Sequence, residues 1–257
     1  MTTATLDQAH AATTFGRIAR VVKLNLANPF TTIVLPWIVI TLIFVTSWLI
    51  WLIVFSSVAK SDLDNVSEGM QFSGASSWIF VYMLVVAVQA MNLTFPLALG
   101  YGSTRRDFYL GSALTFVLMS AMWAVGLTIL AVIETATHGW GVGGRMFTAL
   151  YFGSGALTVW QQLIVFFCIS LFFYFLGAAI ASGYVRWKQL GLLLFFGITG
   201  LVGIGAVALL TYNDNWPAVG QFFVTYQAVG VSLWLLVPTA IAGIVGFFVL
   251  RRATPRS

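Results

Sequence analysis

The sequence predicts an all-α membrane protein with six transmembrane helices, and three observations lead to this fold class. Hydrophobic residues make up 60% of the 257 residues and charged residues only 7%, whereas a soluble domain carries about 25% charged residues. Six segments lack any charged side chain and exceed the ~20 residues that cross a bilayer core: 33–55, 78–99, 108–133, 157–183, 190–212 and 229–250. Because backbone amides in lipid must be paired internally, and these runs do not alternate as barrel strands do, we expect helices.

An amphipathic helix is expected before the first span. Residues 1–12 are small and polar without apolar periodicity, which predicts a disordered leader. Over 13–30 an apolar stripe lies opposite a basic one, namely Phe15, Ile18, Val22 and Leu26 against Arg17, Arg20 and Lys23. This pattern is typical of a helix in the membrane interface, with its basic face toward anionic headgroups. The alternative, a solvated helix on a soluble domain, has no such domain here to pack on. Asn28-Pro29 is expected to end the helix.

The connections between spans are unequal in charge. Of the twelve lysines and arginines, ten fall on one side of the spans and only Lys60 and Arg145 on the other. The six spans are expected to form a single transmembrane domain over 31–250. The positive-inside rule predicts that both termini lie in the cytoplasm, with a basic cytoplasmic tail over 251–257. The expected location is a cytoplasmic (plasma) membrane of prokaryotic type. The same rule accounts for the net charge of +5, so no nucleic-acid partner is expected.

Several catalytic classes lack their residues. The two histidines, His10 and His138, form no metal-binding motif, and no metal site is expected. No ionisable side chain falls near the middle of a span, which argues against a proton relay. A Walker A loop needs Gly-Lys-Ser/Thr, but the three lysines follow Val, Ala and Trp. The chain is therefore not expected to be an enzyme or to bind ATP by that route.

Polar residues inside the spans have two interpretations. They lie in the second span and at the start of the fourth: Tyr82, Gln89, Asn92, Gln161 and Gln162. One interpretation is a partly polar substrate path. The other is interhelical hydrogen bonding, worth roughly 0.6 kcal/mol per contact in membranes. Small residues at Gly177/Ala181 and Ala179/Gly183 predict close approach of another helix, within the subunit or across a dimer.

The connection between the second and third spans is the most distinctive stretch. Its central window, 103–107, packs three charged and two hydroxyl residues together in a chain poor in charge. The segment Ala98-Leu-Gly-Tyr-Gly-Ser-Thr-Arg-Arg-Asp-Phe-Tyr-Leu-Gly111 resembles the small-Leu-Gly-x-x-x-Arg-Arg-x-Phe-x-x-Gly turn of ABC exporter permeases of the type 2 family. That family also has six spans, an amphipathic first helix and cytoplasmic termini.

The resemblance implies a permease subunit without its own ATPase. In such families this turn, 100–111 here, is a coupling element that docks on a separate nucleotide-binding subunit, and two permeases join two ATPases. Carried over, the coupling residues are Ser103, Thr104, Arg105, Arg106, Asp107 and Phe108. Arg105 and Arg106 are expected to pair with acidic groups on the ATPase, Phe108 to anchor the turn, and Ser103 or Thr104 to cap the helix start.

The resemblance also defines the expected partners. They are an ABC ATPase subunit that holds ATP and Mg²⁺, a second permease copy or a paralogue, and the lipid bilayer; no cofactor is expected in this chain. An amphiphilic or hydrophobic substrate, such as a drug, lipid or peptide, is expected. Two alternatives stay open: a secondary transporter or channel outside the ABC class, and a membrane scaffold without transport.

Overall fold

The computed structural model describes residues 14–57, 77–148 and 157–252, and within these ranges every regular element is helical. The helices are α1 (Thr14–Asn25), α2 (Leu35–Ser57), α4 (Trp78–Gln89), α5 (Phe95–Gly100), α6 (Arg105–Ala136), α7 (Val159–Trp187), α8 (Gln189–Tyr212), α9 (Trp216–Trp234) and α10 (Leu236–Arg251). Three π-helical turns complete them: η1 (Phe30–Val34), η4 (Ala90–Thr94) and η5 (Gly139–Gly143).

Six helical stretches are long and apolar enough to cross a membrane, as the sequence predicts. They are Phe30–Ser57, Trp78–Gly100, Arg105–Ala136, Val159–Trp187, Gln189–Tyr212 and Trp216–Arg251. The first joins η1 to α2, the second joins α4, η4 and α5, and the last joins α9 to α10. Each contains one predicted span or nearly all of it, because the absence of charge over about 20 residues is a strong local signal.

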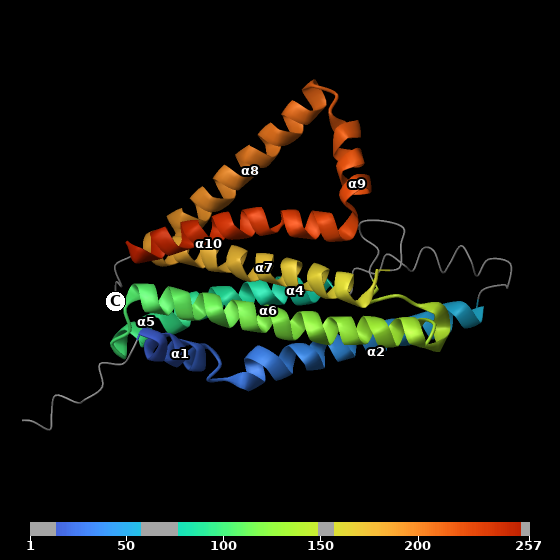
Figure 1. Cartoon of the computed structure of the whole chain (residues 1–257), viewed down its shortest axis with the longest axis horizontal. Helices are drawn as coiled ribbons and strands as arrows, with labels where there is room; N and C mark the ends of the chain where they lie inside the picture. The colour runs from blue at the N-terminus through green and yellow to red at the C-terminus, as the bar shows by residue number, and fades with distance from the viewer. Residues whose placement is uncertain (1–13, 58–76, 149–156, 253–257) are drawn as a thin grey trace, which may run out of the picture.

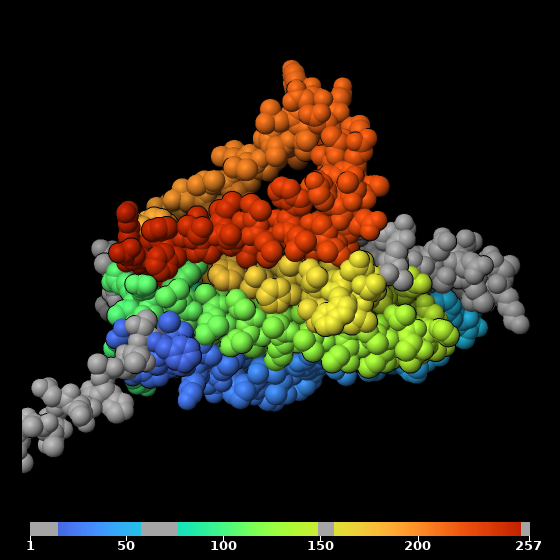
Figure 2. All heavy atoms as spheres, viewed as in Figure 1, coloured from blue at the N-terminus to red at the C-terminus, as the bar shows by residue number. Residues whose placement is uncertain are grey.

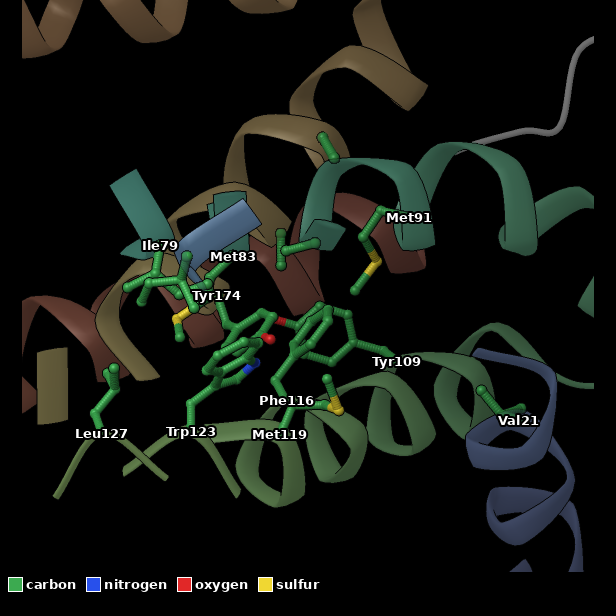
Figure 3. Packing of buried hydrophobic residues seen from close by; sticks show 14 of the residues in the cluster. Val21, Ile79, Met83, Met91, Tyr109, Phe116, Met119, Trp123, Leu127 and Tyr174 are labelled. Carbon is green, nitrogen blue, oxygen red and sulfur yellow. The ribbon is translucent and has the colours of Figure 1, made fainter. Parts of the chain in front are cut away.

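The centre of the molecule is the packing of α4 and α6 against α7 (Figure 1). The α4–α7 contact depends on Gly177, where a Cβ would lie 2.4 Å from the carbonyl oxygen of Leu84. The close approach predicted from Gly177 is therefore realised within the subunit. One turn earlier on α7, Phe116 of α6 stacks on Tyr174 with 5.3 Å between ring centroids. Figure 3 shows this stack continuing to Trp123, so aromatic rings fill the middle of the bundle.

Two further helices close this bundle. Trp37 of α2 stacks on Trp123 at 4.5 Å and lies so near Gly126 that a Cβ there would be 2.5 Å from its ring. On the far side α10 runs along α7, where a Cβ on Gly246 would be 3.5 Å from the Cα of Ala179. We call α1, α2, α4–α7 and α10 the closed bundle.

The remaining two helices form what we call the α8–α9 arm. α8 leaves the bundle beside the end of α10, and α9 returns to the beginning of α10, so the three helices outline a triangle (Figure 1). Of α8, which is described throughout, only Gly191 is buried. The space-filling view leaves an opening between the arm and α10 (Figure 2). Gln227, at φ 49°, breaks α9 and marks where the helix before the last span ends.

Segments that carry cationic residues meet at one end of the bundle, at the left in Figure 1. This end holds α1, the start of α6, the α7–α8 junction and the end of α10, with the following cations: Arg17, Arg20, Lys23, Arg105, Arg106, Arg186, Lys188, Arg251 and Arg252. Arg145 lies at the other end, after η5. The predicted leader 1–12, and residues 253–257 of the predicted tail, lie outside the described residues.

Candidate functional site: the coupling turn

The predicted coupling turn, 100–111, consists of a tight reversal followed by the first turns of α6. α5 ends at Gly100, and the amides of Gly102 and Ser103 donate to carbonyls of Leu99 and Ala98 at 2.9 and 3.0 Å. Gly102 takes φ +78°, a conformation that glycine adopts at little cost. Thr104 then caps α6, because its side chain accepts the amide of Asp107 at 3.1 Å. Of the two predicted caps, Ser103 and Thr104, the structure selects Thr104.

The six predicted coupling residues divide into exposed and buried groups. Thr104 and Arg106 are exposed, and Ser103 and Arg105 are half-buried. Asp107 and Phe108 are buried, the latter completely. Phe108 packs edge to face on Phe95, with centroids 5.2 Å apart. Phe108, expected to anchor the turn, packs on α5 of the same chain and belongs to the core.

Asp107 forms an ion pair within the chain. Its Oδ2 lies 2.8 Å from Nε of Arg17 on α1, and the side chains are 4% and 36% exposed. A buried carboxylate without a cation would carry a large desolvation penalty, which Arg17 offsets. The expectation that Arg17 faces lipid headgroups is therefore corrected. Arg20 and Lys23 are exposed, as a headgroup-facing role requires.

The ion pair is one of three contacts that clamp α1 onto α6. Val21 is buried against Gly111, where a Cβ would lie 2.6 Å from that of Val21. One turn on, Asn25 donates from Nδ2 to Oγ of Ser112 at 3.1 Å. Arg17, Val21 and Asn25 are spaced four residues apart and so share one helix face. α1 thus packs on α6 mainly through a mixed polar and apolar stripe; of the predicted apolar stripe, Phe15 is exposed and Leu26 packs against the core.

The start of α6 is also tied to α10. Arg105 donates from Nη1 to the carbonyl of Arg251 at 3.2 Å, and Tyr109 donates to the carbonyl of Gly243 at 2.6 Å. The carbonyl of Arg251 lies in the last turn of α10, where helix carbonyls lack partners within the helix. The coupling turn is thus held between α1 and α10. Its contacts with α10 join residues more than a hundred positions apart, and local sequence reasoning has no signal for them.

The predicted polar path is not one cluster. α4 and α7 run in the same direction, since Phe80 stacks on Phe173 and Leu84 meets Gly177. Gln161 and Gln162 begin α7, so at ~1.5 Å per residue they lie on the order of 20 Å or more from Tyr82, Gln89 and Asn92.

Two of these polar side chains have other partners. Gln161 accepts the amide of Thr158 at 2.9 Å in a capping box. Tyr82 donates to the carbonyl of Thr31 at 2.6 Å. Gln89 is exposed, Asn92 is half-buried and Gln162 is buried.

A second polar constellation lies at the other end of the bundle. Glu134, buried in the last turn of α6, accepts the amides of Met146, Phe147 and Thr148 at 2.9–3.1 Å. It also accepts the indole N–H of Trp140 at 3.1 Å and the hydroxyl of Thr148. This carboxylate folds the segment after η5 back onto α6. The sequence signal for this site is a single acidic residue at the end of an apolar span.

Comparison with models of protein families, with curated proteins and with solved structures finds no match to this chain.

Proposed function

We propose that this chain is the membrane-spanning permease subunit of an ATP-driven ABC exporter. It moves an amphiphilic or hydrophobic substrate (a drug, lipid or peptide), driven by a separate ATPase subunit that docks on the coupling turn. Both termini and the turn face the cytoplasm of a prokaryotic cell, and a second copy or a paralogue completes the permease. ATP and Mg²⁺ are held by the ATPase, not by this chain.

One observation carries the proposal: the coupling turn presents cationic side chains, and contacts with α1 and α10 hold the turn in place. Arg106 is exposed and Arg105 half-exposed at the capped start of a 32-residue helix that continues across the bundle. A force applied at the turn is transmitted along α6, because helix backbone hydrogen bonds resist bending far more than loops do. The contacts of the turn with α1 and α10 extend this unit to three helices.

In this mechanism ATP binding in the partner biases two arrangements of the permease. Arg105 and Arg106 pair with carboxylates of the ATPase, and closure of two ATPases moves the two coupling turns. α6 and α10 move with the turn, since Arg105 and Tyr109 join them. The contribution of this chain is mechanical: its residues receive and distribute motion.

The proposal is tested with an ATPase carrying a Walker A motif that copurifies with the chain. The double variant Arg105→Glu/Arg106→Glu is expected to uncouple ATP hydrolysis from transport in proteoliposomes. A matched control is Arg145→Glu, which makes the same kind of change at an exposed position on the opposite end. Coupled transport by the double variant at the wild-type rate would refute docking at the turn.

The orientation has its own test. A cysteine replacing Ser103, in a Cys168→Ala background, is expected to react with an impermeant maleimide only from the cytoplasmic side. Cys168 is the one cysteine of the sequence and is buried. Labelling from outside intact cells would reverse the proposed orientation.

A further inference from the structure

The coupling turn is part of a larger surface that includes the end of α10. The hydrogen bond from Arg105 to the carbonyl of Arg251 joins residues 146 positions apart and brings the two segments together. Arg106, Arg251 and Arg252 are exposed on this surface, and Arg105 is half-exposed. Among the residues that the structure describes, Asp107 is the one carboxylate at this end, and it is buried against Arg17. The exposed charge of the described residues at this end is therefore positive.

An aromatic ring stands beside these cations. Tyr101, between α5 and α6, is 76% exposed. Its neighbours Gly100 and Gly102 have open surroundings, since a Cβ on either would meet no heavy atom within 4 Å. The ring is therefore exposed in a turn that also carries Arg105 and Arg106, four and five residues further along the chain. Tyrosine and arginine are among the few residue types that dominate protein–protein binding.

We propose that Tyr101, Arg105, Arg106, Arg251 and Arg252 form one docking platform for an acidic protein surface with an apolar recess that receives the tyrosine ring. The identity of that protein as an ATPase rests on the proposed function. The anchor is Tyr101 and not Phe108, which the core retains. The end of α10 contributes directly, so the docked protein contacts two helices at once.

The construction of the platform favours a protein partner over lipid. An anionic bilayer attracts basic side chains through a diffuse potential that needs no fixed geometry. Here the cations come from two distant segments held in register by a specific hydrogen bond. Charged groups held in a fixed arrangement, together with an exposed aromatic side chain in the same turn, suit complementary recognition by a folded protein.

The test places a photo-crosslinking benzophenone amino acid at position 101 of the full-length chain in its native membrane. The crosslinked protein is identified by mass spectrometry, and its affinity for purified variants is measured. We expect an acidic protein with a Walker A motif. Tyr101→Ala is expected to weaken binding about 30-fold, as expected for a central anchor, and Arg252→Glu about tenfold. Arg145→Glu, at the opposite end, is the control that leaves affinity unchanged.

The possible outcomes separate the platform from the proposed function. If position 101 crosslinks an acidic protein without a Walker A motif, and the same variants weaken that binding, the platform stands and the ATPase proposal fails. If a Walker A ATPase copurifies but Tyr101→Ala and Arg252→Glu bind it at wild-type affinity, the platform fails and the ATPase proposal stands. Crosslinking to lipid alone, both in the cell and in vesicles of phosphatidylcholine and phosphatidylglycerol, also overturns the platform. Size-exclusion profiles confirm that the exposed substitutions leave the chain folded.

Discussion

The closed bundle and the α8–α9 arm both contain helices apolar enough to cross a membrane, yet glycines in the middle of their helices lie in opposite environments. In the bundle, Gly126 and Gly177 receive a neighbouring side chain or backbone nearer than a Cβ would permit. In α8, four glycines have no heavy atom within 4 Å of where a Cβ would stand: Gly197, Gly200, Gly203 and Gly205. Glycine is thus a packing requirement in the middle of the bundle and structurally free along the middle of α8. At the root of the arm the close approach returns, since a Cβ on Gly191 would lie 2.3 Å from the carbonyl oxygen of Gly183.

The difference shows what holds a helical membrane protein together. Lipid tails are as apolar as leucine, so apolarity places a helix in the bilayer but does not join it to another helix. Joining depends on close backbone approach, ring stacking and hydrogen bonds, which the bundle has and α8 lacks over most of its length. A substitution that disrupts helix packing should therefore lower stability strongly in the bundle and only slightly in the arm.

The largest expected effect is that of Gly177→Leu. The added side chain would meet the carbonyl of Leu84 from a Cβ only 2.4 Å away, so α4 and α7 must separate. We expect a loss of about 3 kcal/mol or more of stability, at the upper end of overpacking effects. Gly200→Leu is the matched control in the arm and should change stability by no more than about 0.5 kcal/mol. Thermal unfolding in detergent measures both, and equal sensitivity would contradict the division of the molecule into a closed bundle and an arm.

A second comparison uses one carboxylate from each region. Glu134→Gln keeps one accepting oxygen and replaces the other by an NH₂ group. That group is itself a donor and would face backbone N–H groups that now donate to the carboxylate. We expect a loss of about 2–3 kcal/mol, because these hydrogen bonds are charge-assisted. Amide hydrogen exchange at residues 146–148 should accelerate with it. Asp214→Asn, exposed between α8 and α9, should leave exchange and stability unchanged. Wild-type protection in Glu134→Gln would show that the carboxylate does not hold this segment.

The smallest expected effect concerns α10, where the arm rejoins the bundle. Tyr109→Phe removes the hydrogen bond to the carbonyl of Gly243 and keeps the ring against Phe247. The expected cost is about 0.6 kcal/mol, typical of one interhelical hydrogen bond in a membrane. Tyr212→Phe, at the exposed end of α8, should cost nothing measurable. Replicate unfolding curves that cannot distinguish the two variants would indicate that α10 is held by packing alone.

The coupling turn illustrates how far sequence reasoning reached. Its position between the second and third spans and the capping of its helix by a hydroxyl residue were both predictable, because each depends on a few adjacent residues. The burial of Phe108 and the pairing of Asp107 with Arg17 were not. Asp107 and Arg17 are 90 positions apart, so no local pattern connects them. The exposed aromatic, Tyr101, was visible between two glycines, but only its exposure distinguishes it from Phe108.

The helix α1 shows the same division. Its existence and its end before Asn28-Pro29 follow from the sequence. Its extent was predicted too long, as 13–30, because the helix ends at Asn25. The face that packs does not follow, because α1 offers both an apolar stripe and the mixed stripe containing Arg17 and Val21. The notch at Gly111 and the carboxylate of Asp107 select the second.

By itself, then, the sequence determined six membrane-length helical stretches, their approximate positions and the gathering of cations on the connections that meet at one end. Each of these is a property of a contiguous segment. A span needs an uninterrupted run of apolar residues, and a helix-breaking or capping residue affects only its nearest neighbours in the chain. Only the tertiary structure decided which glycines are contacts, which aromatic of the turn is exposed, and that α8 stands apart from the bundle. Those outcomes depend on shape complementarity between helices far apart in the chain, and shape appears only when the helices are packed.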